Sequence, residues 1–287
     1  MTAAYRSLLF VPGDSERKIA KAVASEADAV ILDLEDSVSP ERKAAARQIC
    51  SDALQGTRNN PMFVRINSLQ SKLAEADLAA VLPHRPDGLM QPKTRSGDDV
   101  SKLVASAGPS MPIIVIATET ASSLLSMASY ASVGSSLIGM AWGGEDLSSE
   151  LGASSNRGDD GRYSDPYRLA RTLCLVGARS AGCEPIDAVH TNYKDLSDLA
   201  AEARASARDG FTGKLAIHPD QVPVINAEFT PSGEAVQRAR DIVAAFEASE
   251  GAGVIGLDGE MLDMPHLDRA HRVLARAQRV RSSHGER

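Results

Sequence analysis

The chain has 287 residues and a formal net charge of −7, with 43% hydrophobic and 24% charged residues. This is the usage of an ordinary globular protein, and it excludes a disordered tail, a collagen and a coiled coil. The acidic balance and an aromatic content of only 4% argue against nucleic-acid binding, which relies on basic patches and stacking aromatic rings.

The cysteines and the N-terminal segment indicate the cellular compartment in which the protein works. The three cysteines form no CxxC pair, so neither a disulfide framework nor a zinc ribbon is expected. The apolar run Leu8–Val11 is too short for the core of a signal peptide, and no stretch approaches the roughly 20 apolar residues of a membrane span. We therefore expect a cytoplasmic protein whose partners are neither nucleic acids nor membranes.

Short apolar runs of strand length recur along the chain, and each is followed by a helical pattern. Most are continuously apolar, which is typical of strands covered on both faces. The eight runs are Ser7–Val11, Ala29–Asp33, Met62–Ile66, Gly88–Met90, Pro112–Ala117, Leu137–Trp142, Ile186–His190 and Lys214–Ile217.

The helical segments between these runs carry recognisable starts. Ser39-Pro40-Glu41 supplies an N-cap, a first-turn proline and a first-turn acid, and Ser164-Asp165-Pro166 repeats the pattern. Eight strand–helix units in about 220 residues fit an α/β protein built as a (β/α)8 TIM barrel. An open doubly wound sheet is the alternative, but no Gly-x-Gly-x-x-Gly follows a strand.

Two segments lie outside this alternation of strands and helices. Gly152–Asp165 is a polar loop after the sixth strand. After the eighth strand come a helix at Gly233–Ser249, an apolar stretch at Val254–Leu257 and a last helix at Pro265–Val280. We therefore divide the chain into a barrel, residues 1–230, and a C-terminal helical extension, residues 231–287, which we expect to dock on the barrel or on a neighbouring subunit.

Polar residues gather where the predicted strands end. The active site of a parallel barrel lies at the carboxyl ends of its strands, so these residues are candidates for function. They combine several acids with a few cations, as a hard metal ion and an anionic substrate require. The set is Asp33, Glu35, Asp36, Arg65, Asn67, Lys93, Glu119, Glu145, Asp146, His190, Asn192 and His218.

Two acids on adjacent predicted strands, Glu119 and Asp146, could together hold a metal ion. Mg²⁺ takes one or two carboxylates, and water and substrate fill its other positions. Either acid alone reads as a cap of the helix that follows it, because acids are favoured at helix N-termini. Glu145 competes with Asp146 for the role, and spacing does not decide between them.

The cations at the same rim have two interpretations each. Arg65 could clamp a substrate carboxylate with two parallel hydrogen bonds, or pair with the acids of strand two. Glu35 and Asp36 would either bind substrate or form a network that orients Arg65. Lys93 could form a Schiff base if it were buried, although an ion pair is the simpler role. For His190 and His218 we favour structural roles over that of a base.

Several motifs together resemble the citrate lyase beta-subunit family, which includes citramalyl-CoA and malyl-CoA lyases. They occur in order over nearly the whole chain, and as a set they are specific. They are Arg6-Ser7-Leu8-Leu9-Phe10-Val11-Pro12-Gly13, Asp33-Leu34-Glu35-Asp36-Ser37-Val38, Val64-Arg65-Ile66-Asn67, Pro92-Lys93, Glu119-Thr120, Gly143-Gly144-Glu145-Asp146-Leu147, Gly213-Lys214, Ile217-His218-Pro219 and Gly259-Glu260-Met261-Leu262-Asp263-Met264-Pro265.

The resemblance implies roles that spacing does not supply. Glu119 and Asp146 would bind Mg²⁺, with Mn²⁺ as an alternative, and Arg65 would bind the oxo-acid part of the substrate. Asp263 matches the family's catalytic carboxylate, which typically reaches the active site of an adjacent subunit in a homotrimer or a hexamer. From the residues alone, Asp263 is an N-cap ahead of Pro265.

The activity implied is a Mg-dependent carbon–carbon lyase. It would cleave a 3-hydroxyacyl-CoA thioester, of the citramalyl-, malyl- or citryl-CoA type, reversibly to acetyl-CoA and a 2-oxo acid. One alternative is the lyase subunit of a citrate lyase complex, and another is a metal-dependent aldolase acting on free hydroxy-oxo acids. Basic residues near the start, including Arg6 and Arg17, are candidates for the CoA phosphates.

Overall fold

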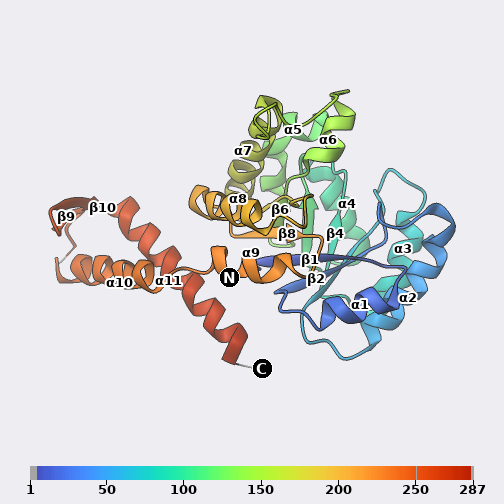
Figure 1. The fold of residues 1–287 in the computed structure, drawn as a ribbon, viewed down its shortest axis with the longest axis horizontal. Coiled ribbons are helices and arrows are strands. Elements are labelled where there is room, and N and C mark those ends of the chain that lie inside the picture. Colours follow the sequence, from blue (N-terminus) through green and yellow to red (C-terminus); the bar gives the residue numbers. More distant parts are fainter. Residues whose placement is uncertain (1–4, 250, 286–287) are drawn as a thin grey trace. The chain divides into compact units, whose positions relative to one another are not determined.

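Eight parallel strands close into a barrel in the computed structural model, which describes residues 5–249 and 251–285 (Figure 1). Each strand pairs with the next along the chain, and the eighth pairs with the first, with Ser7 opposite Lys214. The (β/α)8 barrel is therefore confirmed. Its strands are β1 (Ser7–Pro12), β2 (Ala29–Asp33), β3 (Met62–Arg65), β4 (Gly88–Gln91), β5 (Ile113–Ile116), β6 (Leu137–Ala141), β7 (Glu184–Asp187) and β8 (Gly213–Ala216).

Helices connect the strands. Three short 3-10 helices accompany them: η1 (Pro40–Arg42), η2 (Leu82–His84) and η3 (Met127–Ser132). The α-helices up to the end of the barrel are α1 (Glu16–Val23), α2 (Lys43–Gln55), α3 (Ala74–Val81), α4 (Gly97–Ala107), α5 (Ala121–Leu125), α6 (Gly144–Glu150), α7 (Asp165–Ser180), α8 (Leu196–Asp209) and α9 (Gln221–Phe229).

The position of β7 differs from the predicted strand Ile186–His190, because β7 begins at Glu184 and ends at Asp187. Proline cannot donate a ladder hydrogen bond, so the sequence disfavoured Pro185 as a strand residue. In the structure Pro185 lies opposite Met140 of β6. His190 therefore falls in the loop after the strand.

Apolar side chains fill the barrel, as the continuously apolar strands predicted. Leu8, Ile31, Phe63, Ile114 and Leu215 belong to one buried cluster with contributions from every strand of the barrel. Burying side chains of this size contributes about 1.5–3 kcal/mol each relative to exposing them. The cluster supports the strand ends that carry the polar residues.

A buried ion pair joins the last two strands. Asp187 of β7 lies opposite Lys214 of β8, and Lys214 Nζ is 2.6 Å from Asp187 Oδ2. Both side chains are fully buried, and Trp142 Nε1 and Ser206 Oγ also donate to Asp187. Burial disfavours charge on Asp187, but Lys214 and the nearby Arg171 outweigh it and lower its pKa to about 2.

The chain divides into two compact units, Met1–Asn226 and Ala227–Arg287. In the second unit, α10 (Gly233–Ala248) packs against α11 (Met264–Gly285). An antiparallel hairpin of β9 (Val254–Leu257) and β10 (Glu260–Asp263) connects these two helices. The sequence predicted only an apolar stretch at 254–257, so β10 is an addition. Within the described residues, none of the helices is both long and apolar enough to cross a bilayer.

Candidate active site

Arg65, at the end of β3, is fixed by the acids that follow β2. Its Nε donates to Asp33 Oδ1 at 2.7 Å and its Nη2 to Asp33 Oδ2 at 2.6 Å. Its Nη1 lies 3.0 Å from Glu35 Oε2, and the guanidinium stacks over the Phe10 ring. Burial raises the pKa of Asp33, but the two hydrogen bonds and the charge of Arg65 outweigh it, so the net shift is downward. The arginine is thus charged and oriented before any substrate arrives.

Asp33 also shapes the turn after β2. Its Oδ1 accepts the N–H of Glu35 at 2.8 Å, and its Oδ2 accepts the N–H of Ser37 at 3.1 Å. One carboxylate therefore fixes both the loop and the arginine, which is the orienting network that the sequence allowed for. Glu35 Oε2 is buried and accepts no hydrogen bond from the residues the structure describes.

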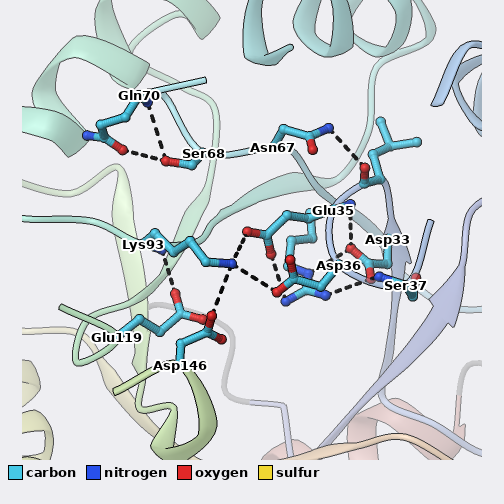
Figure 2. A network of polar contacts seen from close by, with 12 residues as sticks. Asp33, Glu35, Asp36, Ser37, Asn67, Ser68, Gln70, Lys93, Glu119 and Asp146 are labelled. Carbon is cyan, nitrogen blue, oxygen red and sulfur yellow. Dashed lines mark hydrogen bonds and ion pairs between the residues drawn. The ribbon is translucent and has the colours of Figure 1, made fainter. Parts of the chain in front are cut away.

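The Lys93 side chain lies between acids of the loop after β2 and an acid of α6 (Figure 2). Its Nζ is 2.5 Å from Glu35 Oε1, 2.9 Å from Asp36 Oδ2 and 3.3 Å from Asp146 Oδ1. Burial alone would lower the pKa of Lys93, but its hydrogen bonds to Glu35 and Asp36 raise it. The amine is therefore held as an ammonium ion in ion pairs, which is the opposite of what a Schiff-base lysine requires.

The backbone of Lys93 contacts Glu119 directly. Lys93 has a φ of 50°, which is uncommon for a residue other than glycine, and its N–H donates to Glu119 Oε2 at 2.5 Å. The side chain and the backbone of one residue therefore contact Asp146 and Glu119 respectively.

Glu119 and Asp146 lie next to one another on the same side of this lysine, as Figure 2 shows. Glu119 is 4% exposed, and its pKa is raised well above its usual value, first by burial and then by the charge of Asp146. Asp146 is more open, with its side chain 35% exposed. Two carboxylates this close carry excess negative charge, which a cation would stabilise.

Helix capping does not account for these two acids. The N-cap of α5 is Thr120, which accepts the N–H of Ser123, and the N-cap of α6 is Gly143. Asp146 lies in the first turn of α6, where an acid is favourable but does not cap. Glu145 accepts a hydrogen bond from Asn156 at 2.8 Å, so its carboxylate is engaged with the loop after α6.

A cavity of about 490 Å³ opens beside the two acids. The sequence singled out Lys93, Glu119 and Asp146 from its walls but missed the other lining residues, which lie three to nine positions beyond the ends of the strands. The complete lining is Ser68, Gln70, Lys93, Arg95, Glu119, Thr120, Asp146, Ser149 and Glu150.

The donor set fits a hard divalent cation such as Mg²⁺. In the described part of the chain no group of three or more His, Cys, Asp or Glu side chains could hold a metal. Mg²⁺ does not need one, because one or two carboxylates with water and substrate complete its octahedron. Glu119 and Asp146 supply that number of carboxylates on one cavity wall.

Both histidines considered from the sequence have structural contacts. His190 is 3% exposed, and its Nδ1 lies 2.7 Å from Glu202 Oε2. His218 stacks on Tyr193 with the ring centroids 5.0 Å apart. These contacts agree with the structural roles that we favoured.

Asp263 ends β10 in the C-terminal unit and directly precedes α11. Its side chain is half exposed, and its Oδ1 lies 2.5 Å from His266 Nδ1. Arg6, by contrast, is buried at the amino end of the barrel, where its guanidinium pairs with Asp28 at 2.7 Å. The carboxyl ends of the strands carry the candidate site, so Arg6 is wrongly placed to bind a ligand there.

Several known proteins are similar to this chain over nearly its whole length. It is 36% identical over 284 residues to a (3S)-malyl-CoA thioesterase of Cereibacter sphaeroides, covering 96% of this chain and 95% of that protein. It is 33% identical to the mitochondrial citramalyl-CoA lyase of Rattus norvegicus, covering 96% and 87% respectively.

A solved structure, of the protein CitE from Mycobacterium tuberculosis in complex with magnesium, acetoacetate and coenzyme A, is also similar. It is 36% identical, matches with a TM-score of 0.84, and the match covers 97% of this chain and 100% of that one. Residues 172–280 match a family described as a C–C bond lyase of the TIM-barrel fold. Residues 6–219 match the HpcH/HpaI aldolase/citrate lyase family, and the chain, an enzyme of the carbon–carbon lyase type, belongs to that family.

Proposed function

We propose that the protein is a metal-dependent lyase that cleaves a 3-hydroxyacyl-CoA thioester, of the citramalyl-, malyl- or citryl-CoA type, reversibly to acetyl-CoA and a 2-oxo acid. The observation that carries this proposal is the meeting of Glu119 and Asp146 on one cavity beside the oriented Arg65–Asp33 pair. The magnesium and coenzyme A bound by the similar CitE structure support it.

Glu119 and Asp146 would hold Mg²⁺, with Mn²⁺ as an alternative. When bound, the ion would lower the pKa of the substrate hydroxyl in cleavage and polarise the carbonyl of the oxo acid in condensation. The protein would hold both carboxylates in place. Burial and the charge of Asp146 raise the pKa of Glu119, and the hydrogen bond from Lys93 N–H to Glu119 opposes that rise.

Arg65 would bind the oxo-acid part of the substrate and stabilise developing negative charge. A guanidinium has five N–H donors, of which Asp33 takes two, and Nη1 is also paired with Glu35 at 3.0 Å, so one donor on Nη1 and one on Nη2 remain for an anion. Because Asp33 fixes the orientation, no reorganisation is needed when charge develops in the transition state. Glu35, whose Oε2 accepts no hydrogen bond within the described residues, could accept one from a substrate hydroxyl or a water, and Asp36 would hold Lys93 in place.

Asp263 would exchange the proton at the acyl-CoA carbon. In cleavage the substrate hydroxyl loses its proton to water and becomes the carbonyl of the oxo acid as the C–C bond breaks. The electrons of that bond pass to the thioester as an enolate, and protonated Asp263 supplies a proton to the carbon. In condensation the same carboxylate removes that proton. We propose that the C-terminal unit brings Asp263 to the barrel of a neighbouring subunit in a homotrimer or a hexamer.

A second candidate reaction is hydrolysis of the thioester, because relatives of equal coverage are named malyl-CoA thioesterases. The two reactions give different products. Cleavage of the C–C bond gives acetyl-CoA and an oxo acid with no free thiol, whereas hydrolysis gives free CoA and a hydroxy acid.

The test is a panel of malyl-, citramalyl- and citryl-CoA, each with and without EDTA. Both the released oxo acid and the free thiol are measured. The proposal expects one oxo acid per acetyl-CoA, no thiol, and loss of activity with EDTA. Thiol release without oxo acid would identify the thioesterase. Activity only on free hydroxy-oxo acids, or only with added citrate lyase components, would identify an aldolase or a complex subunit.

A further inference from the structure

The cavity beside Glu119 and Asp146 has polar walls beyond these two acids. Its volume is about 490 Å³. On the proposed function it holds the acyl thioester as well as the oxo acid. Its lining also includes Ser68, Gln70, Arg95, Ser149 and Glu150, which come from loops and a helix beyond the strand ends.

Buried Asp99 fixes the wall of this cavity at two points. Its Oδ2 accepts a hydrogen bond from Gln70 Nε2 at 2.9 Å and from the backbone N–H of Arg95 at 3.2 Å. The loop after β3 and the loop after β4 are therefore connected. The amide of Gln70 is further occupied by Ser68 Oγ. The hydrogen bond to Asp99 fixes the backbone of Arg95, and with it the position from which the side chain starts.

Arg95 differs from the other cations of this site. Lys93 is paired with three acids, and Arg65 is paired with two. Among the residues the structure describes, no acid lies within ion-pair distance of the Arg95 guanidinium, although Arg95 is exposed and lines the cavity. Glu150, another acid of the cavity lining, accepts the N–H of Ala121 at 3.4 Å.

We propose that Arg95 binds a second carboxylate on the oxo-acid half of the substrate. This inference rests on the proposed function: Glu119 and Asp146 fix one end of the oxo acid, and the distal carboxylate extends across the cavity to Arg95. Guanidinium and carboxylate form parallel two-point hydrogen bonds, and such pairing discriminates strongly against a ligand that lacks the carboxylate. The preferred substrate would then release a dicarboxylic 2-oxo acid rather than glyoxylate or pyruvate.

The test measures equilibrium binding of oxaloacetate, 2-oxoglutarate and pyruvate by calorimetry in the presence of Mg²⁺. Wild type should bind at least one of the two diacids at least tenfold more tightly than pyruvate. Arg95→Gln should lose that preference while binding pyruvate as wild type does, and Arg95→Lys should keep part of it. The control is Arg208→Gln, an exposed arginine of α8 whose side chain is 77% exposed and lies outside the cavity lining.

The outcomes separate this inference from the proposed function. If Mg²⁺-dependent binding of pyruvate is found without preference for either diacid, or if Arg95→Gln weakens pyruvate and the diacids equally, the inference is wrong and the lyase proposal stands. If Arg95→Gln instead weakens the binding of acetyl-CoA, the arginine binds a phosphate of CoA and the inference is also wrong. If wild type binds no oxo acid with or without Mg²⁺, the proposed function itself is wrong.

Discussion

Arg65 and Asp33 lie opposite one another on neighbouring strands and form a two-point ion pair at the mouth of the barrel, with N–O distances of 2.7 and 2.6 Å. The geometry depends on the planar fork of arginine. A lysine at the same position would keep the charge but could not donate two parallel hydrogen bonds to Asp33 while also facing a substrate.

Arg65→Lys should therefore lower kcat by about 10²–10³-fold, the usual effect of removing one preorganised donor from developing negative charge. The measurement is steady-state kinetics on the best substrate of the panel. Arg47→Lys is the matched control, because Arg47 also forms an ion pair of 2.7 Å with a buried acid, Asp77, but between helices α2 and α3. A kcat of Arg65→Lys near that of wild type would remove Arg65 from the chemistry.

Asp263→Asn should lower turnover by about 10²–10⁴-fold, which is the usual contribution of a general acid–base. Mg²⁺ binding should be unchanged, because the variant leaves Glu119 and Asp146 intact. Asp258→Asn is the control: Asp258 is an exposed acid of the same hairpin, and asparagine tolerates its positive φ of 52°. Normal turnover in Asp263→Asn would contradict the assignment.

Sharing of the site between subunits has its own test. Asp263→Asn and Glu119→Gln should each be inactive alone, because one lacks the proton-exchanging group and the other lacks a metal ligand. Co-expressed in mixed oligomers, they should regain part of the wild-type activity if Asp263 serves a neighbouring barrel. Mixed oligomers that stay inactive would place each Asp263 with its own barrel.

Because Asp187 and Lys214 form a buried ion pair, we expect the free energy of unfolding to depend on pH. The pKa of Asp187 is about 2 in the fold against an ordinary 3.8, so the folded state favours the ionised carboxylate. This contribution, roughly 2 kcal/mol, is fully present above the unfolded pKa and is lost as the pH falls through the folded pKa. The free-energy gap between wild type and Asp187→Asn should therefore be widest above about pH 5 and narrow toward pH 2.

Urea denaturation between pH 7 and pH 3 measures that gap. Above pH 5, Asp187→Asn should cost about 3–5 kcal/mol, because it removes the shorter of the two ion pairs of buried Lys214 and leaves the one with Glu202 at 3.5 Å. Asp165→Asn, at a site that is 93% exposed, should change the free energy of unfolding little at any pH. A gap between wild type and Asp187→Asn that does not vary with pH would show that the carboxylate is not stabilised by this pair.

The barrel could be predicted from the sequence because most of its strands are continuously apolar runs followed by a helix. The hairpin of β9 and β10 was missed, although its turn, Asp258-Gly259, is a strong hairpin signal with positive φ at both positions. The strands on either side of that turn, Val254–Leu257 and Glu260–Asp263, lack the alternation of apolar and polar residues that usually identifies strands.

The candidate site was only partly predictable. Strand ends in a parallel barrel meet at one rim, so Glu119, Asp146 and Arg65 could be grouped from their positions alone. Spacing could not show that the Lys93 ammonium reaches acids of both the loop after β2 and helix α6, because that depends on loop conformation and on a backbone with φ of 50°. Asp187 and Lys214 were hidden inside runs that read as apolar strands.

The most direct test of the account is Mg²⁺ binding, measured by calorimetry on wild type and on Glu119→Gln, Asp146→Asn and Glu145→Gln. The account predicts that Glu119→Gln and Asp146→Asn each weaken Mg²⁺ affinity by at least about tenfold. Glu145→Gln should bind the ion as wild type does, because Glu145 is engaged with Asn156. Wild-type affinity in Glu119→Gln or Asp146→Asn would contradict the central claim.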